Sequence, residues 1–436
     1  FYPSELADGG YDVIDYRNVD PRLGTMADFD AMAAAAHEAG IKVIVDIVPN
    51  HTSNKHKMFI EALAAGRGSA ARDRYIFREG RGEHGELARK LDMFLSGHLP
   101  EIDYKSIEVK AGVATRAASA TVLGVFAEKI ENMIVASADL SNSDKTDGYL
   151  KKTKAFTKGD FSGKFFQAGV SELTMACVAN GMALHGGVIP ACGTFFVFSD
   201  YMKPAVRLSA LMRLHVIYVW THDSFRVGED GPTHQPVEHE AQIRLMEHLK
   251  NHHDERSMLV LRPADGDETV MAWKLAVEEH RPVALVLSRQ NIKTLPALGT
   301  SRREEAAQVS KGGYVVMDSA KPEVVMVATG SEVATLVEGA ELLAAEGISV
   351  RVVNVPSEGL FRDQPKSYQE GILPAGVVRY GLTSGLPVNL MGLVGEKGMI
   401  HGLDHFGWSA PYTVLDEKFG YNGATVAAEV KKLLGR

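Results

Sequence analysis

Short apolar runs alternate with helix-forming stretches through the middle of the chain. Strand-length apolar runs occupy residues 134–137, 216–221 and 283–288. Helix-forming residues fill 115–130 and 172–185, the second with small residues on the face that would meet a sheet. Such alternation is typical of a mostly parallel sheet covered by helices, with ligands at the carboxyl ends of the strands. The pattern therefore predicts a doubly wound α/β domain.

The same alternation returns near the carboxyl terminus. Residues 323–328 and 349–355 are apolar and strand-like, and a helix is expected between them from about 332 to 346. Gly330 lies at the turn into this helix, where it serves either a tight turn or an anion at the helix amino terminus. The pattern predicts a second α/β domain over 312–436.

The amino-terminal region carries one helix signal and one strand signal. Thr25 and Asp28 have the spacing of a capping box, and residues 26–39 are mostly helix formers. Residues 42–48 are an apolar run that predicts a buried parallel strand, and so one β-α-β unit. The polar residues at the end of this run either cap and bridge loops or carry the chemistry that barrel enzymes place there.

Composition and charge exclude several classes of protein. Of the 436 residues, 45% are hydrophobic and 23% are charged, as in ordinary globular proteins. The net charge of −8 offers no basic footprint for nucleic acid, and no apolar run approaches the roughly 18 residues of a membrane span. Cys177 and Cys192 provide no disulfide framework, which favours a reducing cytoplasm. The chain begins at Phe1 without a methionine, so we expect a fragment at that end.

Candidate chemistry gathers behind the second apolar run. The run at 216–221 leads directly into His222, and a loop at 228–236, stiffened by glycine and proline, presents Asp230 and His234. Histidine donates hydrogen bonds to phosphates and shuttles protons near neutral pH. The alternative is a surface loop with ordinary histidines. A zinc site is disfavoured because the histidines lack the spacing of a zinc motif.

Three further features allow either a structural or a functional interpretation. Arg289 follows the third apolar run, where a guanidinium suits bidentate phosphate binding, or else pairs with an acid across the domain. Glu172 begins a helix, where the helix dipole alone favours a carboxylate. An aromatic cluster either packs in the core or sandwiches a flat heterocycle. The cluster includes Phe195, Phe198 and Tyr201.

Five short motifs in the first 85 residues carry a family resemblance. They lie at 7–12, 24–25, 46–53, 75–78 and 82–85. Together they resemble the alpha-amylase family of glycoside hydrolases, and most closely its alpha-glucosidase and trehalose synthase branch. The resemblance implies that Asp8, Tyr11 and His51 help to hold a glucosyl ring and that Asp46 supports the site. Because the catalytic carboxylates of that family come from later strands, it implies a catalytically empty piece of a (β/α)8 barrel over 1–85.

A second set of motifs covers the rest of the chain. They are Thr-Arg-Ala-Ala-Ser at 115–119, Ser-Ala-Asp-Leu at 137–140, Leu-His-Gly-Gly at 184–187, Thr-His-Asp-Ser at 221–224, Gly-Pro-Thr-His-Gln at 231–235 and Leu-Ser-Arg-Gln-Asn at 287–291. From about residue 86 onward the sequence resembles transketolase. The resemblance implies a pyrimidine-binding domain over 111–295 and a C-terminal domain over 312–436. Residues 86–110 would form the junction, and the abrupt change of family is more typical of a chimeric sequence than of an evolved fusion.

This resemblance implies a role for each candidate residue. Glu172 would hydrogen-bond the aminopyrimidine ring of thiamine diphosphate and favour the imino form, which takes the proton from the thiazolium carbon. The pyrimidine would pack against Phe195, Phe198 and Tyr201. His222 would lie near the reacting carbon and the sugar hydroxyls, and Asp230 would contact a substrate hydroxyl. The sugar phosphate would be held by Arg116, Ser143, His234 and Arg289. The implied reaction moves a two-carbon ketol unit from a ketose phosphate to an aldose phosphate.

One part of the family pattern has no counterpart. In transketolases a separate domain holds the diphosphate and Mg²⁺ or Ca²⁺ through a Gly-Asp-Gly motif, whereas Gly266 and Asp267 are followed here by Glu268. No metal ligand is therefore assigned, and we expect the isolated chain to be inactive. It would act on sugar phosphates as a homodimer or with a separate diphosphate-binding subunit, as in a split transketolase. The other alternative is a carbohydrate-binding remnant of an alpha-glucosidase or trehalose synthase.

Overall fold

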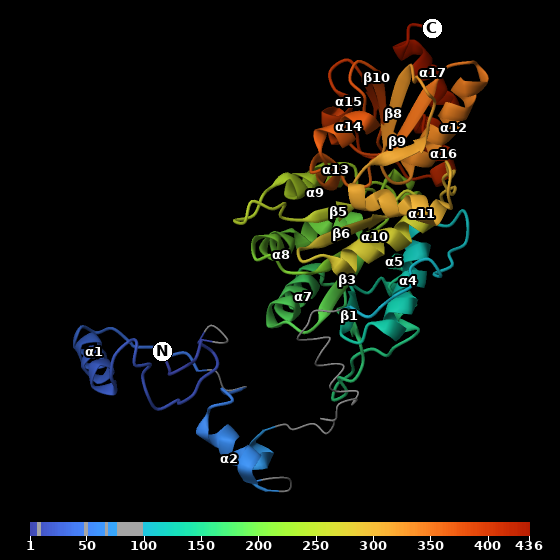
Figure 1. The fold of residues 1–436 in the computed structure, drawn as a ribbon. Coiled ribbons are helices and arrows are strands. Elements are labelled where there is room, and N and C mark those ends of the chain that lie inside the picture. Colours follow the sequence, from blue (N-terminus) through green and yellow to red (C-terminus); the bar gives the residue numbers. More distant parts are fainter. Residues whose placement is uncertain (7–9, 48–50, 66–68, 76–98) are drawn as a thin grey trace. The chain divides into compact units, whose positions relative to one another are not determined.

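A computed structural model describes residues 1–6, 10–47, 51–65, 69–75 and 99–436 (Figure 1). The chain divides into two compact units, Phe1–Arg89 and Lys90–Arg436. Asp8, the motif at 82–85 and most of the junction expected at 86–110 lie outside the described residues.

The first unit contains two helices and a short helical turn among its described residues. They are α1 (Met26–Glu38), α2 (Lys57–Ala65) and η1 (Arg72–Arg74). The capping box predicted before α1 is present: the Thr25 side chain accepts from the backbone of Asp28, and the Asp28 carboxylate accepts from the backbone of Thr25. None of the residues of α1 is buried, so local capping rather than packing sets its amino-terminal boundary.

The strand predicted at 42–48 does not form. Residues 41–47 are irregular, and Ile44 is 91% exposed. Val48, the last residue of the prediction, lies outside the described part of the chain. A parallel strand needs neighbours that pair its backbone and cover both its faces. The described residues of the first unit supply only an isolated bridge between Ser4 and Val13, so the β-α-β prediction is wrong.

The second unit begins with a six-stranded sheet in the order β2-β1-β3-β4-β6-β5, and every pairing in it is parallel. Its strands are β1 (Met133–Ser137), β2 (Phe165–Gln167), β3 (Ile189–Phe195), β4 (Ile217–Thr221), β5 (Leu259–Leu261) and β6 (Val283–Leu287). Its larger helices are α4 (Thr115–Lys129), α7 (Glu172–His185), α8 (Ser199–Leu211), α9 (His239–His248) and α10 (Gly266–Glu278). Shorter helices are α5 (Ser141–Asp144) and α6 (Asp147–Leu150). This is the doubly wound domain that the pattern predicted.

Both faces of this sheet are buried, which explains the continuous apolar runs of its central strands. Along β4, Ile217 and Val219 belong to the core shared with α4 and α10. Tyr218 and Trp220 belong to the core shared with α7 and α8 on the other face. Successive side chains of a strand point to opposite faces, so an apolar residue is needed at every position.

A five-stranded sheet in the order β11-β10-β8-β9-β7 forms the carboxyl-terminal domain. Its strands are β7 (Tyr314–Met317), β8 (Val324–Ala328), β9 (Val350–Asn354), β10 (Val378–Leu382) and β11 (Met399–His401), and only β7 runs antiparallel to its neighbour. Its helices are α12 (Glu332–Ala345), α13 (Glu358–Arg362), α14 (Lys366–Ile372), α15 (Val388–Val394), α16 (Tyr412–Phe419) and α17 (Gly423–Leu433). The second predicted α/β domain is therefore present.

A short helix, α11 (Arg302–Ala306), lies in the segment that joins the two sheets. Arg302 donates to the Asp265 carboxylate at 2.6 Å and to the Tyr314 hydroxyl at 2.8 Å, and thus connects the two domains through a buried guanidinium. Both cysteines are unpaired, with Cys177 exposed and Cys192 buried. No helix within the described ranges is long and apolar enough to cross a membrane.

Candidate active site

Three central strands of the first sheet end side by side. In the strand register, Phe195 at the end of β3 pairs with Thr221 at the end of β4, and Thr221 pairs with Leu287 at the end of β6. The residues that follow these strands therefore share one edge of the sheet. This is the edge at which open parallel sheets bind ligands.

His222 lies at the centre of this edge. It is 2% exposed, and its ring stacks on Phe195 with 3.6 Å between the ring centroids. Nε2 lies 3.2 Å from Nη1 of Arg116, and Nδ1 lies 2.8 Å from Oγ1 of Thr221. A guanidinium only donates, so Nε2 accepts and the ring proton is assigned to Nδ1, which donates to Thr221.

The environment keeps the His222 ring neutral. Burial lowers the pKa of its imidazole well below the ordinary value, and the positive charges of Arg116 and Arg289 and the ring of His234 lower it further. A neutral ring with an unprotonated Nε2 accepts a hydrogen bond, so the geometry offers a neutral acceptor at a sheet edge surrounded by cationic groups.

Two guanidinium groups make this edge suited to an anion. Nη1 of Arg116 donates to the Ser143 carbonyl at 2.7 Å and to the Ser143 hydroxyl at 3.4 Å. Burial and the charge of Arg289 lower the pKa of Arg116 to about 10. Within the described residues Arg289 makes no hydrogen bond or ion pair, so the predicted alternative of an acid partner across the domain is not realised. An unengaged guanidinium beside a second one is typical of phosphate and carboxylate sites.

The predicted aromatic cluster forms a ladder of rings. Phe195 and Phe198 stack at 5.8 Å with 13° between their planes, and Phe198 and Tyr201 stack at 6.0 Å with 20°. The rings of His234 and Phe198 meet edge to face, with 5.4 Å between their centroids. Tyr201 is 62% exposed, so this ladder is not merely core packing. It offers flat apolar faces to a heterocycle.

Glu172 begins α7, which packs against β3 and α8, the elements that carry the aromatic ladder. The residue is 8% exposed, yet its carboxylate has no hydrogen bond or ion pair with any described residue. Its carboxylate is therefore available to accept a hydrogen bond from a ligand that carries an N–H donor. Together with the ring ladder, this carboxylate fits an aminopyrimidine.

The structure leaves two groups of predicted residues without a formed site. Asp230 is exposed, on the loop after β4, and makes no hydrogen bond or ion pair with the other candidate residues among those described. In the first unit, Tyr11, Asp46 and His51 are all exposed on segments that form no sheet. The described residues of that unit therefore do not bring the predicted sugar-binding side chains together in a formed site.

Sequence reasoning missed three contributors. Thr221 accepts the His222 ring proton, and Asp223, directly after His222, forms a buried ion pair with Arg262 at 2.8 Å. The position of Asp223 next to a candidate histidine was a usable signal. Its partner Arg262 lies 39 residues further along the chain, and no local sequence signal indicated that it would pair with Asp223. One cluster of ligand-type side chains was also not predicted: atoms of Asp200, Glu238 and His239 that can bind a metal ion lie within 4.8 Å of one another.

Comparison with known proteins assigns most of the chain to one family. The model of the transketolase pyrimidine-binding domain matches residues 111–294, and that of the transketolase-like C-terminal domain matches 312–422. A transketolase of Geobacillus stearothermophilus is 43% identical over 360 residues, 81% of this chain and 52% of that protein. The chloroplastic transketolase of Craterostigma plantagineum is 41% identical over 368 residues, 82% of this chain and 68% of that protein. The chain belongs to the transketolase family.

Solved transketolases share its fold. The transketolase of Leishmania mexicana superposes with a TM-score of 0.71 at 35% identity, over 79% of this chain and 49% of that one. A split-gene transketolase, described as an inactive β4 tetramer, gives a TM-score of 0.56 at 25% identity, over 74% of this chain and 99% of that one. The chain spans about half the length of the first curated transketolases that it matches.

The amino-terminal region gives a different result. A model of the alpha-amylase catalytic domain matches residues 1–104, a minor part of the chain. The described residues of this region form no sheet and expose the three candidate sugar-binding side chains that can be seen. The structure thus does not support the expected fragment of a glycoside hydrolase.

Proposed function

We propose that this transketolase-family chain carries the pyrimidine side and the phosphate side of a ketol-transfer site. The observation that carries the proposal is the cluster at one sheet edge: neutral His222, unengaged Arg289 and the ring ladder that starts at Phe195. The reaction would move a two-carbon ketol unit from a ketose phosphate to an aldose phosphate.

Thiamine diphosphate, when bound, supplies the nucleophilic carbon and the electron sink that ketol transfer requires. The residues of this chain fit its pyrimidine end. Glu172 would accept a hydrogen bond from that ring, which would lie against Phe198 and Tyr201. His222 would accept a hydrogen bond from a sugar hydroxyl through Nε2, in place of the one that Arg116 donates to it.

The anionic end of the sugar would be held by the cationic groups of the site. Arg289 offers its whole guanidinium, and Arg116 is already oriented by Ser143. His234 lies beside the ring ladder, where its Nε2 is available to a phosphate. Asp230 would contact a substrate hydroxyl from the exposed loop. These assignments follow the family resemblance and agree with the charge around His222.

We infer that the diphosphate and the Mg²⁺ or Ca²⁺ ion are bound by a domain that the matched regions do not include. The matches cover the pyrimidine-binding and C-terminal domains, and the chain spans about half of the full-length relatives. The helices α7 and α8, which begin beside the site, expose large apolar side chains along their length, a surface of the kind that partner domains cover. They are Leu173, Leu184, Leu208 and Leu211.

A split transketolase is the second candidate. The match covers 99% of the solved split-gene chain, which is described as an inactive β4 tetramer. In this version the second subunit would be a separate polypeptide. The alternative within one polypeptide is a homodimer in which each diphosphate-binding domain meets the pyrimidine-binding domain of the other copy.

The test is reconstitution. The purified chain is mixed with a separately produced diphosphate-binding domain of a bacterial transketolase, thiamine diphosphate and Mg²⁺, and transfer between sugar phosphates is measured. We expect no turnover from the chain alone and turnover after mixing. Glu172→Gln should reduce kcat by about 100-fold or more, as expected for loss of a catalytic acid–base group. Glu278→Gln, on the exposed face of α10, is the matched control and should leave turnover unchanged.

Two outcomes would contradict the proposal. Turnover by the unmixed chain would show that it needs no added domain. A stable mixed complex, seen by analytical ultracentrifugation, that still lacks turnover would show that these residues do not perform ketol transfer.

A further inference from the structure

The backbone at His222 adopts a conformation that histidine does not favour by itself. Its φ is +64°, in the left-handed region, and the residue is not a glycine. Strained positions of this kind persist where surrounding contacts over-determine them. The ring contacts Thr221, Arg116 and Phe195. Contacts of a different kind fix the residue that follows.

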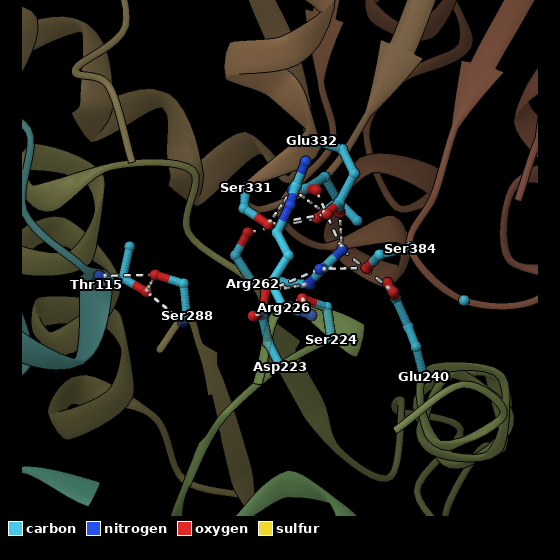
Figure 2. A network of polar contacts seen from close by, with 12 residues as sticks. Thr115, Asp223, Ser224, Arg226, Glu240, Arg262, Ser288, Ser331, Glu332 and Ser384 are labelled. Carbon is cyan, nitrogen blue, oxygen red and sulfur yellow. Dashed lines mark hydrogen bonds and ion pairs between the residues drawn. The ribbon is translucent and has the colours of Figure 1, made fainter. Parts of the chain in front are cut away.

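Asp223, the next residue, lies in the buried polar network of Figure 2. Its Oδ2 accepts from both Nη2 of Arg262, at 2.8 Å, and Nε of Arg262, at 3.2 Å. Its Oδ1 accepts from the Ser224 hydroxyl at 3.3 Å. Arg262 directly follows β5 and is 1% exposed. The backbone after His222 is thus tied to a second strand end of the same sheet.

Arg262 also binds the C-terminal domain. Its Nη1 donates to Glu332 at 2.5 Å and to the Thr329 carbonyl at 3.2 Å, and its Nη2 donates to the Ser384 hydroxyl at 3.0 Å. Glu332 is the first residue of α12 and is fully buried. The Glu332 carboxylate also accepts from Nη1 of Arg226 at 3.2 Å. Arg226 lies in the 3₁₀ turn after β4, so two segments of the first domain bind the same carboxylate. One guanidinium therefore joins the residue beside His222 to a helix of the other domain.

Both domains contribute charged groups to this network. Its cations are Arg226 and Arg262, and its carboxylates are Asp223, Glu240, Glu332 and Asp416. Removing one partner of a buried pair leaves the other charge uncompensated. Gly330 is so close that a Cβ there would lie 2.8 Å from Nε of Arg262. Packing therefore leaves the guanidinium little freedom to take another position.

We propose that Arg262 is a positioning residue for His222. Through Asp223 it holds the left-handed backbone that places the imidazole between Phe195 and Arg116, and Glu332 makes the C-terminal domain part of this support. The catalytic importance of His222 rests on the proposed function. Its placement does not, because the position of the ring can be measured without turnover.

The test follows the His222 ring by NMR in the full chain, labelled with ¹⁵N-histidine and assigned with His222→Gln. The groups that face the ring, Arg116, Arg289 and His234, are not substituted in any test variant. In Arg262→Gln and Asp223→Asn we expect loss of the single Nδ1-protonated form. We also expect the imidazole pKa to rise by at least about 1, a tenfold gain in proton affinity. Glu332→Gln should give the same change at smaller size.

A matched control separates positioning from general loosening. Arg302 is similarly buried and also links the two domains, through Asp265 and Tyr314, but it does not touch the neighbours of His222. Arg302→Gln should lower the melting temperature and leave the His222 signal unchanged. An unchanged His222 signal in folded Asp223→Asn would overturn the proposal, and so would an equal change in Arg302→Gln.

Two safeguards keep the result decisive. If Arg262→Gln does not fold, Asp223→Asn still answers the question, because Arg262 keeps Glu332 and Glu240 as partners. If reconstitution gives turnover, Asp223→Asn should lower kcat about tenfold with less than a twofold change in KM, since a displaced group costs rate more than binding. If reconstitution gives none, the ketol-transfer proposal fails while the NMR result still decides the role of Arg262.

Discussion

Two apolar stretches of this chain look alike in sequence and end in opposite states. Residues 41–47 are irregular and exposed, with Ile44 at 91% exposure, whereas Ile217–Thr221 is a strand in which every residue is buried. The second stretch has β3 and β6 on its two sides and helices over both faces. The comparison shows that an apolar run specifies a tendency to pair, and that neighbours decide whether a strand results.

Helices respond differently to the same contrast. The helix α1 forms with no buried residue, whereas α4 buries seven of its residues. A helix satisfies its backbone within itself, and a capping box closes part of its first turn. A strand satisfies its backbone only through other strands. Sequence signals for helices are therefore local, and those for parallel strands are conditional on the rest of the fold.

The largest predicted effect comes from removing a core residue of the second unit. Trp273 is fully buried and packs edge to face against Phe126, with 5.6 Å between the ring centroids. Its indole N–H donates to the Ser119 hydroxyl at 2.8 Å. Trp273→Ala should lower the free energy of unfolding by about 3–5 kcal/mol. Ile44→Ala is the control and should change it by less than about 0.5 kcal/mol. Denaturant unfolding measures both, and a comparable loss in Ile44→Ala would show that the first unit has a core after all.

A pair of glycines sharpens the comparison inside the second unit. A Cβ on Gly193, in β3, would lie 2.6 Å from the Thr146 methyl and 2.9 Å from the Asp144 carboxylate. Gly193→Ala should therefore cost about 1–3 kcal/mol through overpacking. A Cβ on Gly181, inside α7, would meet nothing within 4 Å. Gly181→Ala should raise stability by about 0.5–1 kcal/mol. Melting temperatures that shift in the same direction in both variants would contradict the packing seen here.

The smallest predicted effect is a pH dependence in the C-terminal domain. His401 Nδ1 lies 3.0 Å from the Glu429 carboxylate, and Nε2 lies 2.9 Å from the Phe419 carbonyl. Burial opposes protonation, but the hydrogen bond and charge of Glu429 outweigh it and raise the pKa of His401 above its ordinary value. The charged pair thus stabilises the folded state fully below about pH 6.5 and loses that contribution as pH rises through the folded pKa.

This dependence can be isolated by substitution. Unfolding free energies measured from pH 6 to 8 should fall less in His401→Gln than in the parent chain. Glu429→Gln should have the same flattening effect, because it removes the group that raises the histidine pKa. A parent chain whose stability rises over this range, while both variants stay flat, would reverse the sign of the proposed coupling.

Much of the second unit could be predicted from the sequence. Strands β1, β4 and β6 and the helices α4 and α7 followed from pattern, and His222 and Arg289 were placed correctly at strand ends. Strand β3, which ends at Phe195, was not predicted. Strands β5 and β11 have only three residues each and carry too little pattern to be noticed. The link from Asp223 through Arg262 to Glu332 joins residues 39 and 70 positions apart, which no local pattern encodes.

The exposed stretch at 41–47 has a consequence for handling the protein. It contains Ile41, Ile44 and Ile47, all more than half exposed, in a backbone without ladder partners. Such a run is a template for pairing between separate molecules, which is how edge strands start aggregation. Lys42 and Asp46 are the charges that interrupt it, in the manner of gatekeeper residues. The solubility of the chain at high concentration should therefore depend on these two side chains more than on the stability of the folded sheets.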